Sequence, residues 1–491
     1  IYVIAISMSC LVAWVIVKRY RKVMRRLMSA PVTSVSTSQP SPTLSQALTS
    51  PDHLTLADNR RAGIHLTLLL IGLSCLLSMT STSIWMLLSY PNEPFSLKRT
   101  ATMAVLYIWP FIPAIGLAWR WSRWRILGVL ALWCLLCFPF YLWRSIEPRP
   151  MELLNWMSIE IGTTMFLSAL ILLGKTTRAV APWLLLPFIG LVWTSIVGLD
   201  TLTFFLTPIL ASPLFSWLPD GWLGVFMLSA IFATLPWLLA WWPMRQLGRI
   251  LGWAYAHKWL SELMVLFTAL WAFTLFDKVL QNANNSGWAS LALFLPLLWI
   301  PIVTLLYAKF HNRSKRPPTL LVLRVFQRDE QVKALFDHVI ERWRLSGNTV
   351  MIAGTDLAGR TIDADDIFTF LDGGLGARFI QKSTDVMTRI AAFDMEPDVE
   401  GRYRINECYC HDTTWQDTLR TLVERSDVVL MDLRGFQANN SGCRYELTTL
   451  AQSTRPLRVV VLVDEQTDRI TAMEAVSLGR SEHFIWLDAQ Q

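Results

Sequence analysis

Charged residues are scarce in this chain, and cysteines are few. Of its 491 residues only 16 % are Asp, Glu, Lys or Arg, whereas soluble proteins carry about 25 %. The 7 cysteines are too few for a disulfide-stabilised scaffold of this length. Hydrophobic residues make up 53 % of the chain, which excludes a disordered protein and does not fit an ordinary soluble enzyme.

Acidic residues are scarce only in the first part of the sequence. Residues 1–317 hold 25 Lys and Arg against 10 Asp and Glu, a net charge of +15. Residues 318–491 hold 19 against 27, a net charge of −8, and the two values sum to +7. The pI near 9.1 therefore averages two unlike parts and does not describe a nucleic-acid-binding surface, so no nucleic-acid partner is expected.

Long apolar runs recur before Pro317, and each is near the roughly 20 residues that a helix needs to cross a bilayer. The first run starts without a Met, so we expect residues to be missing at the N-terminus. A cleaved signal peptide fits poorly there, because the basic cluster follows the apolar run. The nine expected spans are 1–17, 64–89, 101–119, 126–143, 157–174, 183–206, 222–242, 260–277 and 288–309.

The basic residues between these spans predict the orientation of the chain. Of the Lys and Arg residues before Pro317, 20 fall on one side of the bilayer and five on the other. Basic loops stay in the cytoplasm, so the N-terminus lies outside and everything after Phe310 is cytoplasmic. We therefore expect a multi-pass protein of a bacterial plasma (inner) membrane, with the lipid bilayer as a partner.

Composition also suggests the boundaries of the parts. The stretch around residues 30–57 is rich in Ser, Thr and Pro and nearly uncharged, which is typical of a flexible loop. The expected parts are a first transmembrane helix with its basic flank at 1–29, a flexible cytoplasmic loop at 30–63, a multi-span membrane domain at 64–310, a hinge at 311–318 and an α/β domain at 319–491.

After the hinge, short β-branched runs alternate with amphipathic segments, which indicates a mainly parallel sheet between two layers of helices. We expect a three-layer, flavodoxin-like α/β domain. The predicted strands are 319–326, 349–355, 402–410, 427–433, 457–464 and 483–488. The predicted helices are 331–347, 363–374, 377–393, 413–426, 441–453 and 467–479.

The segment 427–450 carries the residues best suited to chemistry. A buried strand ends at Asp432, a polar loop contains Asn440, Ser441 and Gly442, and a helix then presents Glu446 about one turn in. In open α/β sheets, ligands bind at the carboxyl ends of the strands, so this carboxylate can face a bound molecule. The alternative is a carboxylate that only complements the helix dipole.

This segment resembles two related families. The run from Leu419 to Leu447 is similar to the central part of TIR domains, in which a Cys precedes a Glu-Leu pair by three residues, as Cys443 precedes Glu446 here. It also resembles nucleoside 2-deoxyribosyltransferases, whose strand-end Asp, Gly loop and Glu match Asp432, Gly442 and Glu446. The resemblance implies cleavage of a ribose N-glycosidic bond, with Glu446 as the catalytic residue.

Such a cleavage passes through an oxocarbenium-like state that a nearby carboxylate stabilises. A single Glu suffices when the leaving base is already cationic, as nicotinamide is. We therefore expect a nucleotide-type ligand, with NAD as a substrate, and no cofactor. The expected substrate-binding residues are Asp432, Asn440, Ser441, Gly442, Cys443, Asp412, Trp415, Gly354 and Asp356.

Several other residues have competing interpretations. The thiols Cys408, Cys410 and Cys443 and the imidazole of His411 follow strands expected to be neighbours, but Cys-x-Cys-His is not a standard zinc spacing, and no metal site is predicted. The basic residues Arg324 and Arg434 fit pyrophosphate binding or plain surface charge. Four acidic residues inside spans suggest solvation near the interface more than an ion pathway: Glu160, Asp200, Glu262 and Asp277.

Three functions remain open from the sequence. The first is an N-glycosidase, an NAD glycohydrolase or a deoxyribosyltransferase-like enzyme. The second is a non-catalytic nucleotide-sensing or signalling adaptor coupled to a membrane sensor, and the third is a transporter with a regulatory domain. In each, the membrane part serves as a sensor, an anchor or a platform for a homo-oligomer.

Overall fold

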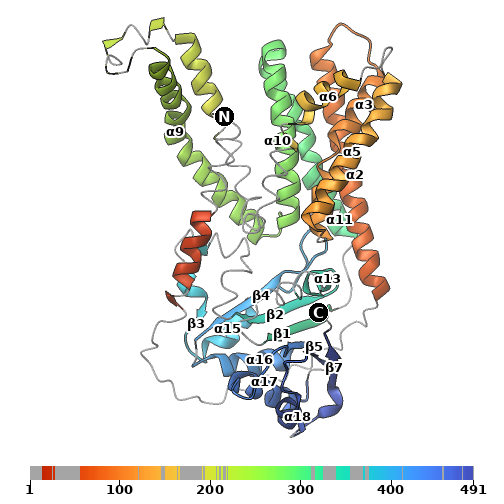
Figure 1. Ribbon diagram of the computed structural model, residues 1–491, viewed down its shortest axis with the longest axis vertical. Coiled ribbons are helices and arrows are strands. Elements are labelled where there is room, and N and C mark those ends of the chain that lie inside the picture. The colour runs from red at the N-terminus through yellow and green to blue at the C-terminus, as the bar shows by residue number, and fades with distance from the viewer. Residues whose placement is uncertain are drawn as a thin grey trace. The chain divides into compact units, whose positions relative to one another are not determined.

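The structure is a computed structural model of the chain (Figure 1). It describes residues 14–24, 26–27, 56–119, 121–144, 150–162, 164–165, 191, 194–205, 207–208, 212–213, 217, 219, 221–310, 316–324, 335, 339–353, 369–370, 375–411, 413–455, 458–477 and 479–489. Two compact units emerge. One, the helical unit, includes 67–305, and the other, the α/β unit, includes 306–362 and 369–491.

The described part of the helical unit consists mainly of apolar helices. The helix pair α3 and α4 shares one apolar stretch, and Pro139 lies inside α5. The elements are α2 (Leu56–Ser89), α3 (Leu97–Tyr107), α4 (Phe111–Ala118), α5 (Arg123–Arg144), α6 (Pro150–Met157), the π-helical turn η1 (Ser158–Gly162), α9 (Trp222–Ala256), α10 (Glu262–Ser286), the 3-10 helix η3 (Gly287–Leu298) and α11 (Trp299–Phe310).

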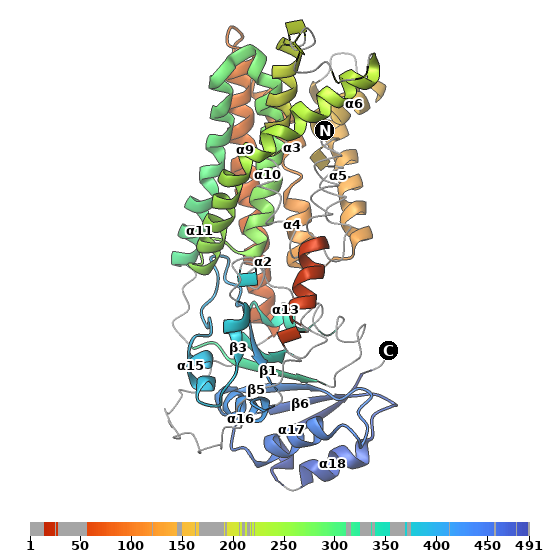
Figure 2. The ribbon, with the colours of Figure 1, turned by 90° about the vertical axis from the view of Figure 1, so that its left-hand side faces the viewer.

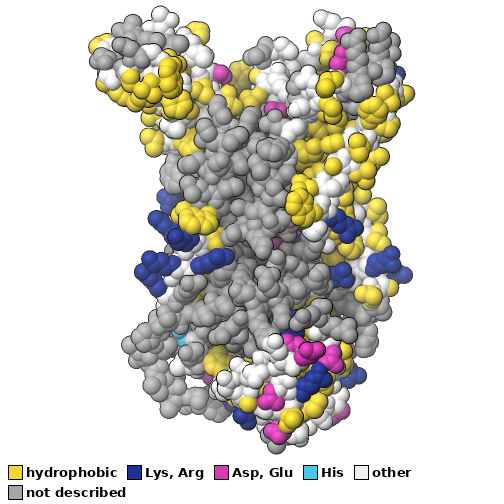
Figure 3. All heavy atoms as spheres, in the orientation of Figure 1, with side chains coloured by type: hydrophobic (Ala, Val, Ile, Leu, Met, Phe, Trp, Pro, Cys, Tyr) yellow, Lys and Arg dark blue, Asp and Glu magenta, His cyan; other side chains and the backbone are white. Residues whose placement is uncertain are grey.

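Six apolar stretches among the described residues are long enough to cross a membrane. They are Leu56–Ser89, Leu97–Ala118, Trp124–Trp143, Trp222–Ala240, Glu262–Ala283 and Gly287–Lys309. Hydrophobic side chains cover much of the visible outer face of the helices (yellow in Figure 3), as expected for contact with lipid. The chain is thus consistent with a multi-pass membrane protein.

These six stretches coincide with six of the nine expected spans. Of the other three, 1–17 and 157–174 lie mostly outside the described residues, and 183–206 is described only at 191 and 194–205. Within the last of them, the structure has a shorter apolar helix at Thr194–Phe205. The expected number of nine spans is therefore not confirmed.

The α/β unit contains a seven-stranded sheet in which every pairing is parallel. The strand order is β3-β4-β2-β1-β5-β6-β7. The chain therefore builds the sheet outward in both directions from β1. The strands are β1 (Thr319–Arg324), β2 (Asn348–Ala353), β3 (Phe379–Ile380), β4 (Ile405–Cys410), β5 (Val428–Asp432), β6 (Arg458–Val463) and β7 (Phe484–Asp488).

Helices cover both faces of the sheet. One face packs against α15 (Asp385–Ala391), α16 (Trp415–Arg425), α17 (Ser441–Gln452) and α18 (Arg469–Ser477), and Figure 2 shows α16, α17 and α18 along it. On the other face, Leu320 and Val322 contact Ile340, beside α13 (Glu341–Trp343). Two short 3-10 turns complete the unit, η6 (Leu375–Arg378) and η7 (Ser481–His483).

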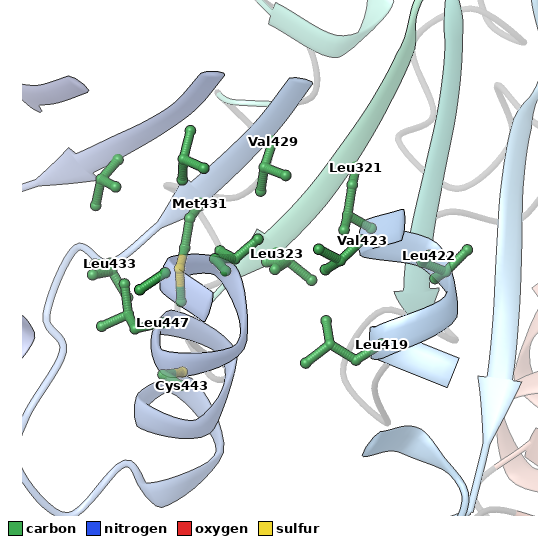
Figure 4. Packing of buried hydrophobic residues seen from close by; sticks show 14 of the residues in the cluster. Leu321, Leu323, Leu419, Leu422, Val423, Val429, Met431, Leu433, Cys443 and Leu447 are labelled. Atoms are coloured by element: carbon green, nitrogen blue, oxygen red, sulfur yellow. The ribbon is translucent and has the colours of Figure 1, made fainter. Parts of the chain in front are cut away.

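Alternation along the strands explains this two-sided burial. In β1 and β5, Leu321, Leu323, Val429 and Met431 point to the face of α16 and α17 (Figure 4), whereas their neighbours point to the opposite face. All six residues of β1 are buried, which explains why its sequence is a continuous apolar run.

The sequence predicted six of the seven strands, but the prediction of a helix over 377–393 was wrong at its start. Residues 379–380 form β3, which pairs with the end of β4, and α15 begins only at Asp385. A two-residue edge strand is too short to show any period in the sequence. Its pairing with Tyr409 and Cys410 is a tertiary contact that local propensity does not encode.

Candidate functional site

The candidate site lies where the direction of strand addition reverses, between β1 and β5. From β1 the chain continues to β2 on one side, and it later returns to place β5, β6 and β7 on the other side. Arg324 and Asp432 are paired at the last register position of these two strands. In open α/β sheets, ligands bind at the carboxyl edge at such a reversal point.

Hydrogen bonds connect the loop after β5 to the loop after β6. The backbone N–H of Gly435 donates to Asp464 Oδ1 at 2.8 Å, and the Thr467 hydroxyl donates to the carbonyl of Leu433 at 3.0 Å. Gly435 has a φ of 70°, a left-handed conformation that favours glycine. These bonds fix the path of the chain between Asp432 and α17.

The helix α17 buries one stripe of side chains against the sheet. Its buried residues recur at helical spacing, and Figure 4 shows Cys443 and Leu447 facing Met431 and Leu433 of the β5 region. Glu446 occupies a position on this stripe, where the pattern calls for an apolar residue. The members of the stripe are Cys443, Glu446, Leu447, Leu450 and Ala451.

Glu446 is a buried carboxyl group in a nearly apolar setting. Its side chain is 6 % exposed, and its Oε2 atom has no hydrogen-bond partner among the residues that the structure describes. Burial raises the pKa of Glu446 to about 8, and the positive charge of Arg324 opposes that rise. The carboxyl group therefore holds its proton at neutral pH unless a cation approaches.

Arg324 is buried at the end of β1, with 4 % of its surface exposed. The alternative of a plain surface charge is therefore wrong for this residue. A guanidinium at the carboxyl edge of the sheet, beside a carboxyl group, suits the binding of an anionic or ribose-phosphate group.

Asp432, expected to bind substrate, is paired within the chain. Arg434 donates Nε to Asp432 Oδ1 at 2.8 Å and its terminal nitrogen to Oδ2 at 2.6 Å. This pairing raises the pKa of Arg434 above its ordinary value. The bidentate pair holds the start of the β5–α17 loop, so Asp432 stabilises this loop.

The other expected residues of this loop fall into two groups. Asn440 accepts a hydrogen bond from the backbone of Gln437 at 2.8 Å, Ser441 is exposed, and a Cβ added to Gly442 would meet only open space. Ser441 and Gly442 therefore border free space at the start of α17, whereas the Asn440 side chain stabilises the turn before it. Cys443 instead lies in the hydrophobic core, where burial strongly raises the pKa of its thiol.

Tyr445, which precedes Glu446 in the sequence, belongs to an aromatic pair. The ring of Trp415, the first residue of α16, packs edge to face against the ring of Tyr445, with the two ring centres 5.3 Å apart. The guanidinium carbon of Arg420 lies 5.7 Å from the centre of the Tyr445 ring. The Tyr445 hydroxyl is buried without a hydrogen-bond partner within the described part of the chain. Sequence reasoning found Trp415 but missed Tyr445, although its position next to Glu446 was a usable signal.

Three expected site residues, Gly354, Asp356 and Asp412, lie outside the described residues. The expectation that the thiols after the third and fourth predicted strands are neighbours was wrong. The strands β2 and β1 separate β4, which carries Cys408 and Cys410, from β5. Within the described ranges, no group of three or more His, Cys, Asp or Glu residues is arranged to hold a metal ion.

Comparison of the chain with models of known protein families, with curated proteins and with solved structures finds no match.

Proposed function

We propose that the α/β unit binds a nucleotide and hydrolyses its N-glycosidic bond, with NAD as the substrate and Glu446 as the catalytic carboxylate. One observation carries this proposal. Glu446 is buried at the strand-reversal edge, and its Oε2 atom lacks a hydrogen-bond partner among the described residues. An unsatisfied buried carboxyl group costs stability, and strongly perturbed groups of this kind concentrate at functional sites.

The strand order supports the proposed resemblance to TIR domains and nucleoside 2-deoxyribosyltransferases. The strands β2-β1-β5-β6-β7 follow the order 2-1-3-4-5 of flavodoxin-like sheets, and β4 and β3 extend the sheet beyond β2. The proposed catalytic Glu446 then follows the central strand β5, as the motif with Cys443 and Leu447 implies.

The proposed chemistry uses one carboxylate. The bond between C1′ of the ribose and the nicotinamide nitrogen breaks, and its electron pair neutralises the positive ring. Ionised Glu446 stabilises the positive charge that develops on the ribose. Water then adds to C1′ and releases a proton to solvent, which yields nicotinamide and ADP-ribose.

The protonation state of Glu446 fits a cationic substrate. The pKa of about 8 keeps the carboxyl group neutral at pH 7. A nicotinamide ring carries a positive charge, and a cation nearby favours the carboxylate form. Binding of the substrate thus generates the ionised group that the reaction needs.

The test uses the full-length protein in lipid nanodiscs incubated with NAD, with nicotinamide release as the readout. We expect wild type to release nicotinamide and Glu446→Gln to be slower by roughly 10²–10³-fold, as for loss of a transition-state electrostatic partner. Glu474→Gln, an exposed carboxylate of α18, is the matched control and should keep the wild-type rate. No release by wild type, or equal rates for wild type and Glu446→Gln, overturns the proposal.

A second candidate is a nucleotide sensor without turnover. The raised pKa favours it, because a neutral carboxylic acid donates an O–H hydrogen bond to a ligand. This function predicts that calorimetry detects NAD binding while nicotinamide release stays absent. It also predicts that Glu446→Gln, which keeps a donor, binds nearly as well as wild type.

The cellular context is part of the proposal. The six apolar stretches and the excess of basic residues on one side of the expected spans support a multi-pass inner-membrane protein. We place the α/β unit in the cytoplasm, on a membrane part that senses or oligomerises. Protease added to sealed inside-out vesicles should cleave the α/β unit, and protease added to right-side-out vesicles should not.

A further inference from the structure

The helix α9 is longer than a membrane crossing requires. It runs over Trp222–Ala256, 35 residues or about 52 Å, whereas the apolar stretch within it ends at Ala240. The next apolar stretch begins at Glu262, the first residue of α10. Residues 241–261 therefore connect two candidate membrane crossings at one boundary of the bilayer.

One side of this connecting segment is apolar and buried. Leu251 and Tyr255 of α9 pack with Val265 of α10, and Leu247 borders the same cluster. Because Leu247, Leu251 and Tyr255 recur every four residues, they form a single stripe along the helix. This stripe fixes the rotation of the segment about its own axis, so the opposite side faces away from α10.

The opposite side carries a row of basic and aromatic residues, which we call the Arg–Trp row: Arg245, Arg249, Trp253 and His257. These four residues also recur every four positions, and all are exposed. Each lies two residues from a member of the buried stripe, about 200° around the helix. In the preceding apolar stretch, by contrast, the exposed large side chains are hydrophobic. The exposed surface of α9 thus becomes cationic where the helix leaves that stretch.

The turn after α9 adds another aromatic ring to this row. Lys258 in this turn has a φ of 61°, the one positive value for a residue other than glycine in the described part of the chain. Such a conformation costs free energy and persists only where the surrounding structure requires it. After this turn the exposed Trp259 packs edge to face on Trp253, with ring centres 5.2 Å apart, and the His257 ring lies 4.4 Å from Trp253 on its other contact. Indole rings prefer the depth of the lipid headgroups.

The connecting segment is cationic without compensating acidic residues in its sequence. No Asp or Glu occurs between Gly221 and Ser261. The next acidic residue, Glu262, lies in the first turn of α10, where it complements the helix dipole. Arg245 and Arg249 are one helical turn apart, with about 6 Å between their Cβ atoms, so both guanidinium groups can reach one phosphate.

We propose that the Arg–Trp row binds the headgroup of an anionic phospholipid, with Arg245 and Arg249 on its phosphate and Trp253 and Trp259 beside its glycerol and first acyl carbons. The excess of basic residues places this segment at the cytoplasmic leaflet, whose surface is anionic. A soluble polyanion would account for the arginines but not for the exposed indole rings, whereas a phospholipid accounts for both. This lipid site is separate from the chemistry proposed at Glu446 and does not depend on it.

The test is native mass spectrometry of the full-length protein in detergent, titrated with phosphatidylglycerol or with phosphatidylcholine of the same acyl chains. Each basic residue near an anionic headgroup should raise affinity about fivefold, so we expect wild type to bind phosphatidylglycerol about 30-fold more tightly than phosphatidylcholine. Arg245→Gln with Arg249→Gln should lose this preference and keep the affinity for phosphatidylcholine. Arg245→Lys with Arg249→Lys should keep most of the preference, because the positive charges remain.

The matched control is Arg60→Gln with Arg61→Gln, which removes the same charge from two exposed arginines of α2 and should keep the wild-type preference. Equal affinities of wild type for the two lipids overturn the proposal, and so does an unchanged preference in Arg245→Gln with Arg249→Gln. Displacement of phosphatidylglycerol by excess inorganic phosphate also overturns it, because the row would then bind a free anion.

Discussion

Two glutamates with little exposed surface, one in each unit, have opposite surroundings: Glu160 is 12 % exposed and Glu446 is 6 % exposed. Glu160 in the helical unit accepts hydrogen bonds from Tyr107 and Lys278, whereas Oε2 of Glu446 in the α/β unit has no such partner among the described residues. Burial alone therefore does not define the role of a carboxyl group. A paired carboxylate joins segments of the fold, and an unpaired one keeps its capacity to interact with a ligand.

The largest effect is expected from breaking the ion pair between Glu160 and Lys278. Lys278→Met leaves the Glu160 carboxylate, which is only 12 % exposed, without its cation, and we expect a loss of about 3–5 kcal/mol of unfolding free energy. Adding Glu160→Gln should restore most of this loss. Thermal unfolding of the full chain in detergent checks both variants, and an unchanged stability of the single variant would contradict the pairing.

The carboxyl group of Glu446 should make the free energy of unfolding of the α/β unit depend on pH. The folded-state pKa of Glu446 is raised to about 8 from an ordinary value of 4.5, so the folded chain binds the proton more tightly than the unfolded chain. The contribution of Glu446 to stability is therefore fully present below about pH 4.5 and is lost as the pH rises through about 8. We expect a decline on the order of 1.4 kcal/mol per pH unit in that window.

The control for this decline is Glu446→Gln, which cannot ionise. The stability of the α/β unit can be measured at several pH values by hydrogen exchange of β5 and α17. The plot of stability against pH should be flatter for this variant than for wild type. At pH 7 or above, the variant should be at least as stable as wild type. A parallel decline in both proteins would contradict the raised pKa of Glu446.

A smaller effect is expected where a buried ion pair holds a loop. Arg434→Met leaves Asp432, which is 4 % exposed, without its bidentate partner and should cost about 2–3 kcal/mol. Chemical denaturation of the full chain measures the change. Arg434→Lys should recover only part of the loss, because an ammonium does not reproduce the two parallel hydrogen bonds.

The smallest effect is expected at an exposed pair. Arg469 and Asp488 are bonded at the surface of the α/β unit, with side chains 44 % and 67 % exposed. Solvent and salt screen such pairs, so Arg469→Gln should change stability by less than about 1 kcal/mol. A cost comparable to that of Arg434→Met would show that burial does not separate the two classes of pair.

Much of the fold could be predicted from the sequence, because local patterns of residues determine where strands and helices form. Six strands and the helices at 415–425 and 441–452 appear where alternation, apolar runs and breaks predicted them. The strand order was not readable, because it depends on packing between distant segments. For that reason the sequence wrongly predicted that the strand carrying Cys408 is next to the strand that precedes Cys443.

The candidate site was readable in part. The motif identified Glu446 as a carboxyl group at the sheet edge, but the sequence did not reveal that it occupies the buried stripe of α17. Arg324 looked like an ordinary charge at the end of an apolar run, and only its place in the sheet buries it beside β5. The pairing of Asp432 with Arg434 depends on a turn geometry that the sequence does not specify.

The most direct test of the central claim is the pH dependence of kcat/KM for nicotinamide release by the full-length protein. If Glu446 acts as a carboxylate, kcat/KM should rise about tenfold per pH unit and level off above about pH 8, the pKa of Glu446. Glu446→Gln should lose this rise together with most of the activity. A profile that is flat through about pH 8, or identical in Glu446→Gln, would contradict the assignment of Glu446 as the catalytic residue.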